Sequence, residues 1–222
     1  MKILDIPQSG KRGPNVSLGG RFGQTSREMV IPTDPRTGAQ LRVRRLLSDV
    51  ASKWRTLTQA QRDAWTTEAS QHKSKPRLGQ SGPLTGCQLW AKINCAALLI
   101  GGDEVTTPPA APSFAILPIS GLVITNTADV ISLKLTTIGA PPDGTMLWGA
   151  KPCSQGRNTA RGLVFLGVLG SPGSDGIDIS SAYKARFGSP KVGSKVFVRV
   201  NQNIHGWEDI PSQFWAIVPA AT

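Results

Sequence analysis

The sequence is poor in the residues that most often bind metals or form cross-links. Among 222 residues there are two histidines and three cysteines. His72 and His205 lie in different halves of the chain and belong to no HxH or HExxH pattern, so we expect no metal site. Cys87 and Cys95 lie on one predicted helix, about 12 Å apart, which is too far for a disulfide. Together with Cys153 they are expected to be free thiols.

Motifs of enzymes and of membrane-spanning segments are also absent. No GxSxG element offers a nucleophilic serine, and the glycine-containing loops 149–156 and 167–176 lack the Lys-Ser/Thr ending of a phosphate-binding loop. We therefore expect no enzymatic activity, no cofactor and no small-molecule substrate. The chain has no apolar run of about 18 residues, and residues 1–7 do not resemble a secretory signal. We expect no membrane span, and synthesis in the cytoplasm.

What the chain does have is an uneven distribution of charge. Residues 1–100 carry 16 Lys and Arg against 6 Asp and Glu, whereas residues 101–222 carry 9 against 8. Nearly all of the net charge of +11 therefore lies in the first half. A basic surface attracts nucleic acid and acidic protein surfaces alike, and charge alone does not distinguish these partners.

Residues 1–40 are punctuated by glycine and proline and contain few apolar residues. Such a segment cannot bury enough surface to offset the entropy that it loses on ordering. We therefore predict an extended basic arm that becomes ordered on a partner, where the apolar piece Met29-Val30-Ile31 is expected to pair as a strand. The residues expected to form this assembly arm are Arg12, Arg21, Arg27, Met29, Val30, Ile31 and Arg36.

Residues 41–102 change to the spacing of helices. Apolar residues between positions 40 and 57 recur three and four positions apart, which predicts a first helix with one apolar stripe. Thr58 and Gln61 match a capping box, as do Thr85 and Gln88, so we expect a second helix over 59–71 and a third that ends at Gly101-Gly102. The apolar stripe consists of Val43, Leu46, Leu47, Val50, Trp54 and Leu57.

Basic residues occupy much of the remaining helical surface and the loop after the second helix. They are candidates for contact with a nucleic acid or with an acidic protein partner. These residues are Arg42, Arg44, Arg45, Lys53, Arg55, Lys73, Lys75 and Arg77.

A proline-rich linker at residues 103–112 precedes an all-β pattern in residues 113–222. About seven antiparallel strands separated by turns are typical of an immunoglobulin or fibronectin type III sandwich, and Ser180–Phe187 reads as a helical turn between strands. The predicted fold class is α+β, with an extended arm, a small three-helix domain and a β-sandwich. The expected strands are 121–125, 130–136, 145–150, 163–169, 176–179, 195–200 and 213–218.

The sequence contains six tryptophans and one tyrosine. Trp54, Trp65 and Trp90 are expected to form the core of the helical domain, and Trp148 and Trp215 to pack inside the sandwich. Trp207 follows a His-Gly turn, so it is predicted to be an exposed contact for a neighbour or a carbohydrate.

Two resemblances concern the first half. The stretch from Trp54 to Trp65, WRTLTQAQRDAW, resembles the core of an HMG box over about a dozen residues. The order of segments also resembles a group of uncharacterised phage and bacterial proteins. They combine a Gly/Arg-rich arm, here residues 20–24, with a Pro-Arg-Thr-x-x-Gln element, here 35–40, the W..LT..QR..W segment and a final β module. This second resemblance implies a role in virions or extracellular assemblies.

Three functions are therefore considered from the sequence. The first is a structural, self-assembling protein of a phage virion (capsid, decoration or tail) or of a filament, whose partners are its own copies or other structural subunits. The second is an accessory protein that binds nucleic acid through the basic helical half. The third is a surface adhesin that uses the sandwich.

Overall fold

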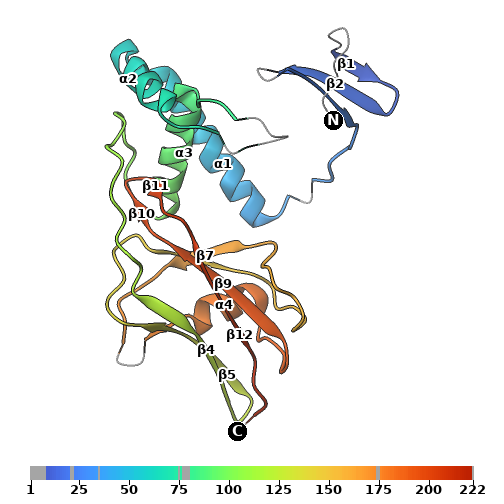
Figure 1. Ribbon diagram of the computed structural model, residues 1–222, viewed down its shortest axis with the longest axis vertical. Helices are drawn as coiled ribbons and strands as arrows, with labels where there is room; N and C mark the ends of the chain where they lie inside the picture. The colour runs from blue at the N-terminus through green and yellow to red at the C-terminus, as the bar shows by residue number, and fades with distance from the viewer. Residues whose placement is uncertain are drawn as a thin grey trace. The chain divides into compact units, whose positions relative to one another are not determined.

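The computed structural model describes residues 9–20, 23–34, 36–74, 76, 81–173 and 176–221. Over these residues the protein is mixed α+β, with four α-helices and several antiparallel sheets (Figure 1). The chain divides into two compact units, residues 1–91 with 106–108, and residues 92–105 with 109–222. The predicted linker, 103–112, thus contributes residues to both units.

The N-terminal sheet of the first unit consists of β1 (Gly10–Arg12), β2 (Asn15–Gly20) and β3 (Gly23–Glu28), in that order. This sheet was not predicted from the sequence, because the alternation of Val16 and Leu18 in β2 is short and the other two strands carry polar residues and glycine. Ser17 is buried, while the other described side chains of the sheet are exposed or half-buried. The sheet therefore has no apolar core of its own.

Three helices follow in the sequence: α1 (Gly38–Lys53), which continues as a 3-10 turn over Trp54–Thr56, then α2 (Gln59–Ser70) and α3 (Gly86–Leu99). The capping boxes predicted at Thr58 and Thr85 are present: each hydroxyl accepts the backbone N–H three residues later, and the Gln there accepts the N–H of the threonine. Thr37 and Gln40 form a third box, which the sequence analysis missed and which starts α1 earlier than predicted.

The tryptophans of the first unit pack together as predicted. Trp65 and Trp90 are fully buried with ring centroids 5.5 Å apart, edge to face, and Trp54 lies 6.1 Å from Trp90. The indole N–H of Trp90 donates to the carbonyl of Val50, and that of Trp65 to the carbonyl of Thr106. These bonds satisfy the polar edge of each ring, so both indoles can be buried without an unpaired donor.

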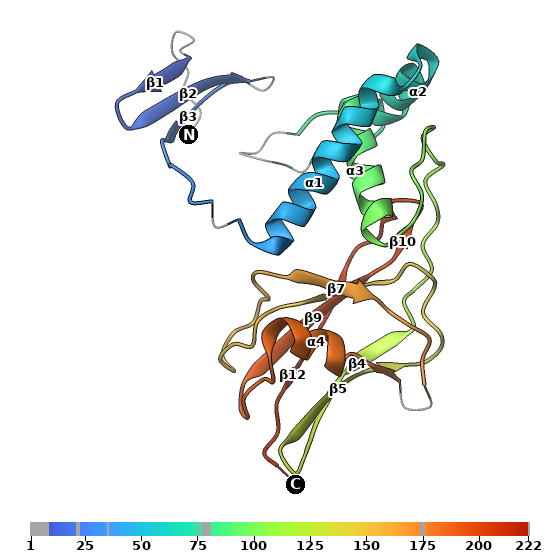
Figure 2. The same cartoon turned by 180° about the vertical axis from the view of Figure 1, so that it is seen from behind.

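The seven predicted strands of the second half all exist, with ends shifted by a few residues. One antiparallel sheet has the order β4 (Ile119–Thr127), β5 (Val130–Thr137) and β8 (Ile177–Asp178). The other has the order β12, β9, β6, β7. Its strands are Ser212–Ile217, Lys195–Asn201, Met146–Gly149 and Val164–Val168, respectively. Figure 2 shows both sheets from the opposite side.

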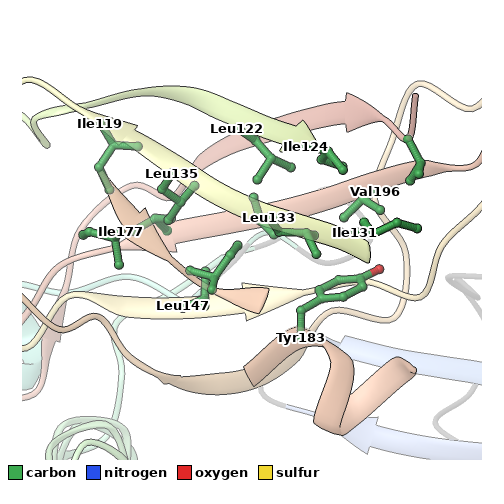
Figure 3. Packing of buried hydrophobic residues seen from close by; sticks show 14 residues of the cluster. Ile119, Leu122, Ile124, Ile131, Leu133, Leu135, Leu147, Ile177, Tyr183 and Val196 are labelled. Carbon is green, nitrogen blue, oxygen red and sulfur yellow. The ribbon is translucent and has the colours of Figure 1, made fainter. Parts of the chain in front are cut away.

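The two sheets of the second unit share one apolar core (Figure 3). Leu133 on β5 and Val196 on β9 are fully buried in it, and Leu147 on β6 is nearly so. The predicted helical turn is α4 (Ser180–Phe187), which places the Tyr183 ring in the same core. The Tyr183 hydroxyl donates to the carbonyl of Ala150 at 2.7 Å.

A short hairpin of β10 (Asn203–Ile204) and β11 (Trp207–Glu208) was not predicted, because two-residue strands leave no alternation to read. His205 and Gly206 form its turn with φ of 50° and 86°. The Asn203 side chain donates to the carbonyl of Ala96 on α3, which fixes the hairpin to that part of the helix.

Candidate functional site

The first candidate site is the N-terminal half of α1 with the segment before it. Asp34 accepts a hydrogen bond from the Arg44 guanidinium at 2.9 Å, and Arg36 lies 3.7 Å from the same carboxylate. The bond from Arg44 lowers the pKa of Asp34 below its ordinary value, and the same pairing raises the pKa of Arg44. Arg44, predicted as a contact for a partner, therefore already has an acidic neighbour.

The apolar stripe of α1 is covered only at its C-terminal end. Val50 and Leu57 are buried, but Val43 and Leu47, earlier on the same stripe, are 59% and 51% exposed. The stripe was predicted from helical spacing, which identifies the apolar face of a helix but not what covers it. The uncovered half is flanked by the exposed cations Arg42 and Arg45.

The segment before α1 is also exposed and apolar. Val30 and Ile31 are 73% and 81% exposed, and β3 ends before them at Glu28. Met29 donates its backbone N–H to the carbonyl of Pro14, which holds the start of this segment to the N-terminal sheet. Of the assembly arm predicted from sequence, Arg21 lies outside the described residues.

Basic residues occur on both faces of the N-terminal sheet. Lys11 and Arg27 both pair with Val16, so their side chains flank it on one face. Arg12 lies in the adjacent row, on the opposite face.

The remaining predicted basic contacts are placed only in part. Lys53 ends α1, Arg55 lies in the 3-10 turn, and both are exposed. Lys73 forms an isolated antiparallel bridge with Pro83. Lys75 and Arg77 lie outside the described residues.

The predicted exposure of Trp207 is wrong. Only 7% of Trp207 is exposed, its indole N–H donates to the carbonyl of Pro109, and the Lys92 ammonium lies 5.7 Å from the ring centroid. Because the carbonyl of Pro109 in the proline-rich segment accepts this hydrogen bond, the Trp207 ring is buried although the residue directly follows a turn. Trp207 is thus a structural residue of the second unit.

The predicted burial of Trp215 is also wrong. Trp215 on β12 is 53% exposed, and it points away from the shared core because its neighbours Phe214 and Ala216 pack against that core. The Lys195 ammonium lies 3.8 Å from the centroid of the Trp215 ring. Trp148 lies on the same outer face and is half-buried.

Metal-ligating side chains do not gather in the part of the chain that the structure describes. There, no three His, Cys, Asp or Glu side chains come close enough to hold a metal ion. All three cysteines are free, and burial raises the pKa of the Cys95 thiol. Asp178 accepts the backbone N–H of Ser180 at 2.8 Å, which is a turn and cap interaction.

The described helices include none that is both long and apolar enough to cross a bilayer. No protein-family model, no curated protein and no solved structure matches the chain.

Proposed function

We propose that this protein is a structural subunit that assembles with copies of itself through residues 9–57, as a component of a virion or a filament. The observation that carries the proposal is the uncovered apolar stripe of α1 at Val43 and Leu47, together with the exposed segment Val30-Ile31 earlier in the sequence. Burial of one such side chain contributes about 1.5–3 kcal/mol, so a neighbour that covers this surface gains a substantial free energy.

The N-terminal sheet supports the same proposal. A sheet of three strands needs an apolar face packed against something to be stable, and the described side chains of β1, β2 and β3 provide no such core. A neighbouring subunit that pairs with or covers this sheet would supply the missing contacts.

The charge around the stripe indicates the kind of assembly. Arg42 and Arg45 flank the uncovered apolar side chains, and an isologous contact would bring these cations against their own copies. Like charges at a contact are unfavourable, so we infer a head-to-tail contact with a different surface of the next subunit. Such contacts produce rings or open filaments.

We further propose that the second unit is a sandwich of the immunoglobulin or fibronectin type III kind. In immunoglobulin sandwiches the first, second and fifth strands share one sheet, and the third, sixth and seventh share the other. The order β4-β5-β8 against β12-β9-β6-β7 fits this arrangement for those six strands when the small β10-β11 hairpin is left aside, and the fourth strand, β7, lies beside the third instead of in the first sheet. Folded modules of this kind suit an outward-facing part of an assembly.

The test is the molar mass of the full chain by light scattering after size-exclusion chromatography. We expect the wild type to form oligomers, and Val43→Asp and Leu47→Asp each to reduce the mass toward that of a monomer. Ile138→Asp is the matched control, because Ile138 is 85% exposed but lies in the second unit. A monomeric wild type, or equal masses for Leu47→Asp and the wild type, would reject the proposal.

Binding of nucleic acid by the first unit is the second candidate. It is favoured by the exposed cations Arg42 and Arg45, which lie one turn apart on α1. Because Arg44 is paired with Asp34, we expect Arg42→Gln with Arg45→Gln to lower DNA affinity more than Arg44→Gln alone. The adhesin interpretation loses its specific residue, because Trp207 is buried.

A further inference from the structure

The outer face of the β12-β9-β6-β7 sheet carries a row of aromatic and polar side chains. The strand registers pair Gln213 with Arg199, Arg199 with Trp148, and Trp148 with Phe165, so these four residues cross the sheet in one line. The next row pairs Trp215 with Phe197, which is fully buried, so Trp215 is the exposed ring of this row. We call these six residues the outer aromatic face.

Several contacts fix the geometry of this face. The ring centroids of Trp148 and Phe165 lie 5.3 Å apart, and the indole N–H of Trp148 donates to the Asn201 side chain. Trp148, Phe165 and Arg199 are half-buried, so their side chains are held by the sheet while part of each remains at the surface. The face is thus preformed instead of assembled from mobile loops.

Lys195 positions the exposed ring of this face. Its ammonium lies over Phe197 and Trp215, at 5.3 and 3.8 Å from the ring centroids, and donates to the carbonyl of Arg157. Lys195 is itself only 5% exposed, so its ammonium interacts with these two rings and the Arg157 carbonyl and is not available to a ligand. The Trp215 ring is therefore supported from one side while about half of the residue remains open.

The charge of this sheet is of one sign. Its four strands contain two cations, Lys195 and Arg199, and no Asp or Glu. The segments next to these strands add the cations Lys151, Arg157, Arg161 and Lys191 and the carboxylates Asp143, Glu208 and Asp209. Because the Lys195 ammonium is buried, Arg199 is the cation that the strands present on this face. A sheet face that combines Trp215 with Arg199 and has no carboxylate complements a ligand with flat rings and negative charge.

We propose that the outer aromatic face binds single-stranded nucleic acid. Unpaired bases stack on aromatic side chains displayed by a sheet, and cations beside them follow the phosphates. Duplex DNA does not fit this face, because its bases are stacked on one another and unavailable to Trp215. The proposal concerns the second unit and does not depend on the assembly proposed for the first.

The experiment is a titration of the full chain into a fluorescein-labelled oligothymidine, followed by fluorescence anisotropy at low and at moderate salt. We expect Trp215→Ala to weaken binding about tenfold at both salt concentrations, because lost stacking is not screened by ions. Trp215→Phe, which keeps an aromatic ring, should retain most of the affinity. Arg199→Gln should weaken binding more at low salt than at moderate salt.

Ile138→Ala is the control for loss of an exposed apolar side chain, and thermal unfolding checks that each variant is folded. Equal affinities of folded Trp215→Ala and wild type would overturn the proposal. Heparin is a polyanion without bases. If the protein bound heparin as tightly as the oligothymidine, and Trp215→Ala changed neither affinity, binding would depend on charge alone and the proposal would also be overturned. Binding of a neutral oligosaccharide that is lost in Trp215→Ala would assign the face to glycans instead.

Discussion

Tyr183 illustrates how a single side chain connects the two sheets of the second unit. Its ring is fully buried in their common core, and its hydroxyl donates to Ala150 at 2.7 Å, directly after β6. Burial raises the pKa of Tyr183 above its ordinary value, because the phenolate would lose its hydration.

We expect Tyr183→Phe to lower the free energy of unfolding by about 1 kcal/mol, the value of one intramolecular hydrogen bond. Urea unfolding at neutral pH measures this loss. Phe187, which lies beside Tyr183 and lacks a hydroxyl, offers a matched control in Phe187→Leu, which changes packing without removing a hydrogen bond. No loss of stability in Tyr183→Phe would mean that the bond to Ala150 contributes nothing.

The raised pKa of Tyr183 also predicts a dependence on alkaline pH. The unfolded chain ionises its tyrosine near pH 10, whereas the folded chain keeps it protonated, so this contribution to stability is complete below about pH 10 and is lost above it. Because the chain has one tyrosine, phenolate absorbance reports on it alone. As the pH is raised, the phenolate absorbance should increase at the same pH at which the protein unfolds. Ionisation of Tyr183 near pH 10 in a protein that is still folded would contradict a raised pKa for Tyr183.

At the scale of elements, the helix caps were readable from sequence and the uncovered surfaces were not. The Thr-x-x-Gln spacing at Thr58 and Thr85 predicted two helix starts. In such a capping box the threonine hydroxyl accepts the backbone N–H of the glutamine, and the glutamine side chain accepts the backbone N–H of the threonine. The exposure of Val43 on α1 could not be predicted, since periodicity does not say whether a partner element is present. In the N-terminal sheet only Val16 and Leu18 alternate, which is too short a pattern to identify three strands.

Whether the tryptophans of the second unit are buried or exposed could not be predicted from the sequence either. In the run Phe214-Trp215-Ala216-Ile217 every residue is apolar, so alternation cannot say which pair faces the core. Trp207 is buried by a bond to Pro109, which lies far away in the sequence. The outer aromatic face therefore becomes visible only when the strands are brought into register.

Thr58→Ala should destabilise the first unit by about 1 kcal/mol, because it removes the acceptor for a free N–H at the start of α2. Thr67→Ala is the matched control on the same helix: Thr67 is exposed and bonds only to the carbonyl of Asp63, and alanine favours helix. Thermal unfolding followed by tryptophan fluorescence measures both. A Thr67→Ala loss as large as that of Thr58→Ala would argue against the cap.

Gly206→Ala should destabilise the second unit by roughly 1–3 kcal/mol. Gly206 has φ of 86°, and a Cβ there would overlap the carbonyl oxygen of Ile93, so the substitution adds backbone strain and a clash. Gly156→Ala is the control, because nothing lies within 4 Å of a Cβ at that position. Denaturant unfolding that showed equal stabilities for the two variants would contradict this account of the hairpin turn.

At the scale of the whole molecule, the distribution of charge and of exposed apolar side chains points to two surfaces with different uses. Residues 9–57 include exposed apolar residues, exposed cations and a sheet without a core, which suits contact with neighbouring subunits. In the second unit, the exposed Trp215 and the half-buried Trp148 and Phe165 lie on a sheet whose strands have no acidic residues, which suits a polyanion. A subunit with both surfaces would combine assembly with binding of nucleic acid.

Salt dependence separates the two uses. Assembly driven by Val43 and Leu47 rests on apolar burial, which salt does not screen, whereas phosphate contacts weaken steeply with salt. We therefore expect the oligomer to persist at moderate salt, where nucleic acid held by charge alone is released.

The most direct test of the assembly claim is the molar mass of the full-length protein by light scattering, at low and at high salt, with ultraviolet absorbance recorded for nucleic acid. We predict a discrete oligomer or a polymer at both salt concentrations, with any nucleic acid that is attached at low salt released at high salt while the mass of the protein oligomer is kept. A protein that is monomeric at both, or that is large only at low salt and only with nucleic acid attached, would contradict the claim.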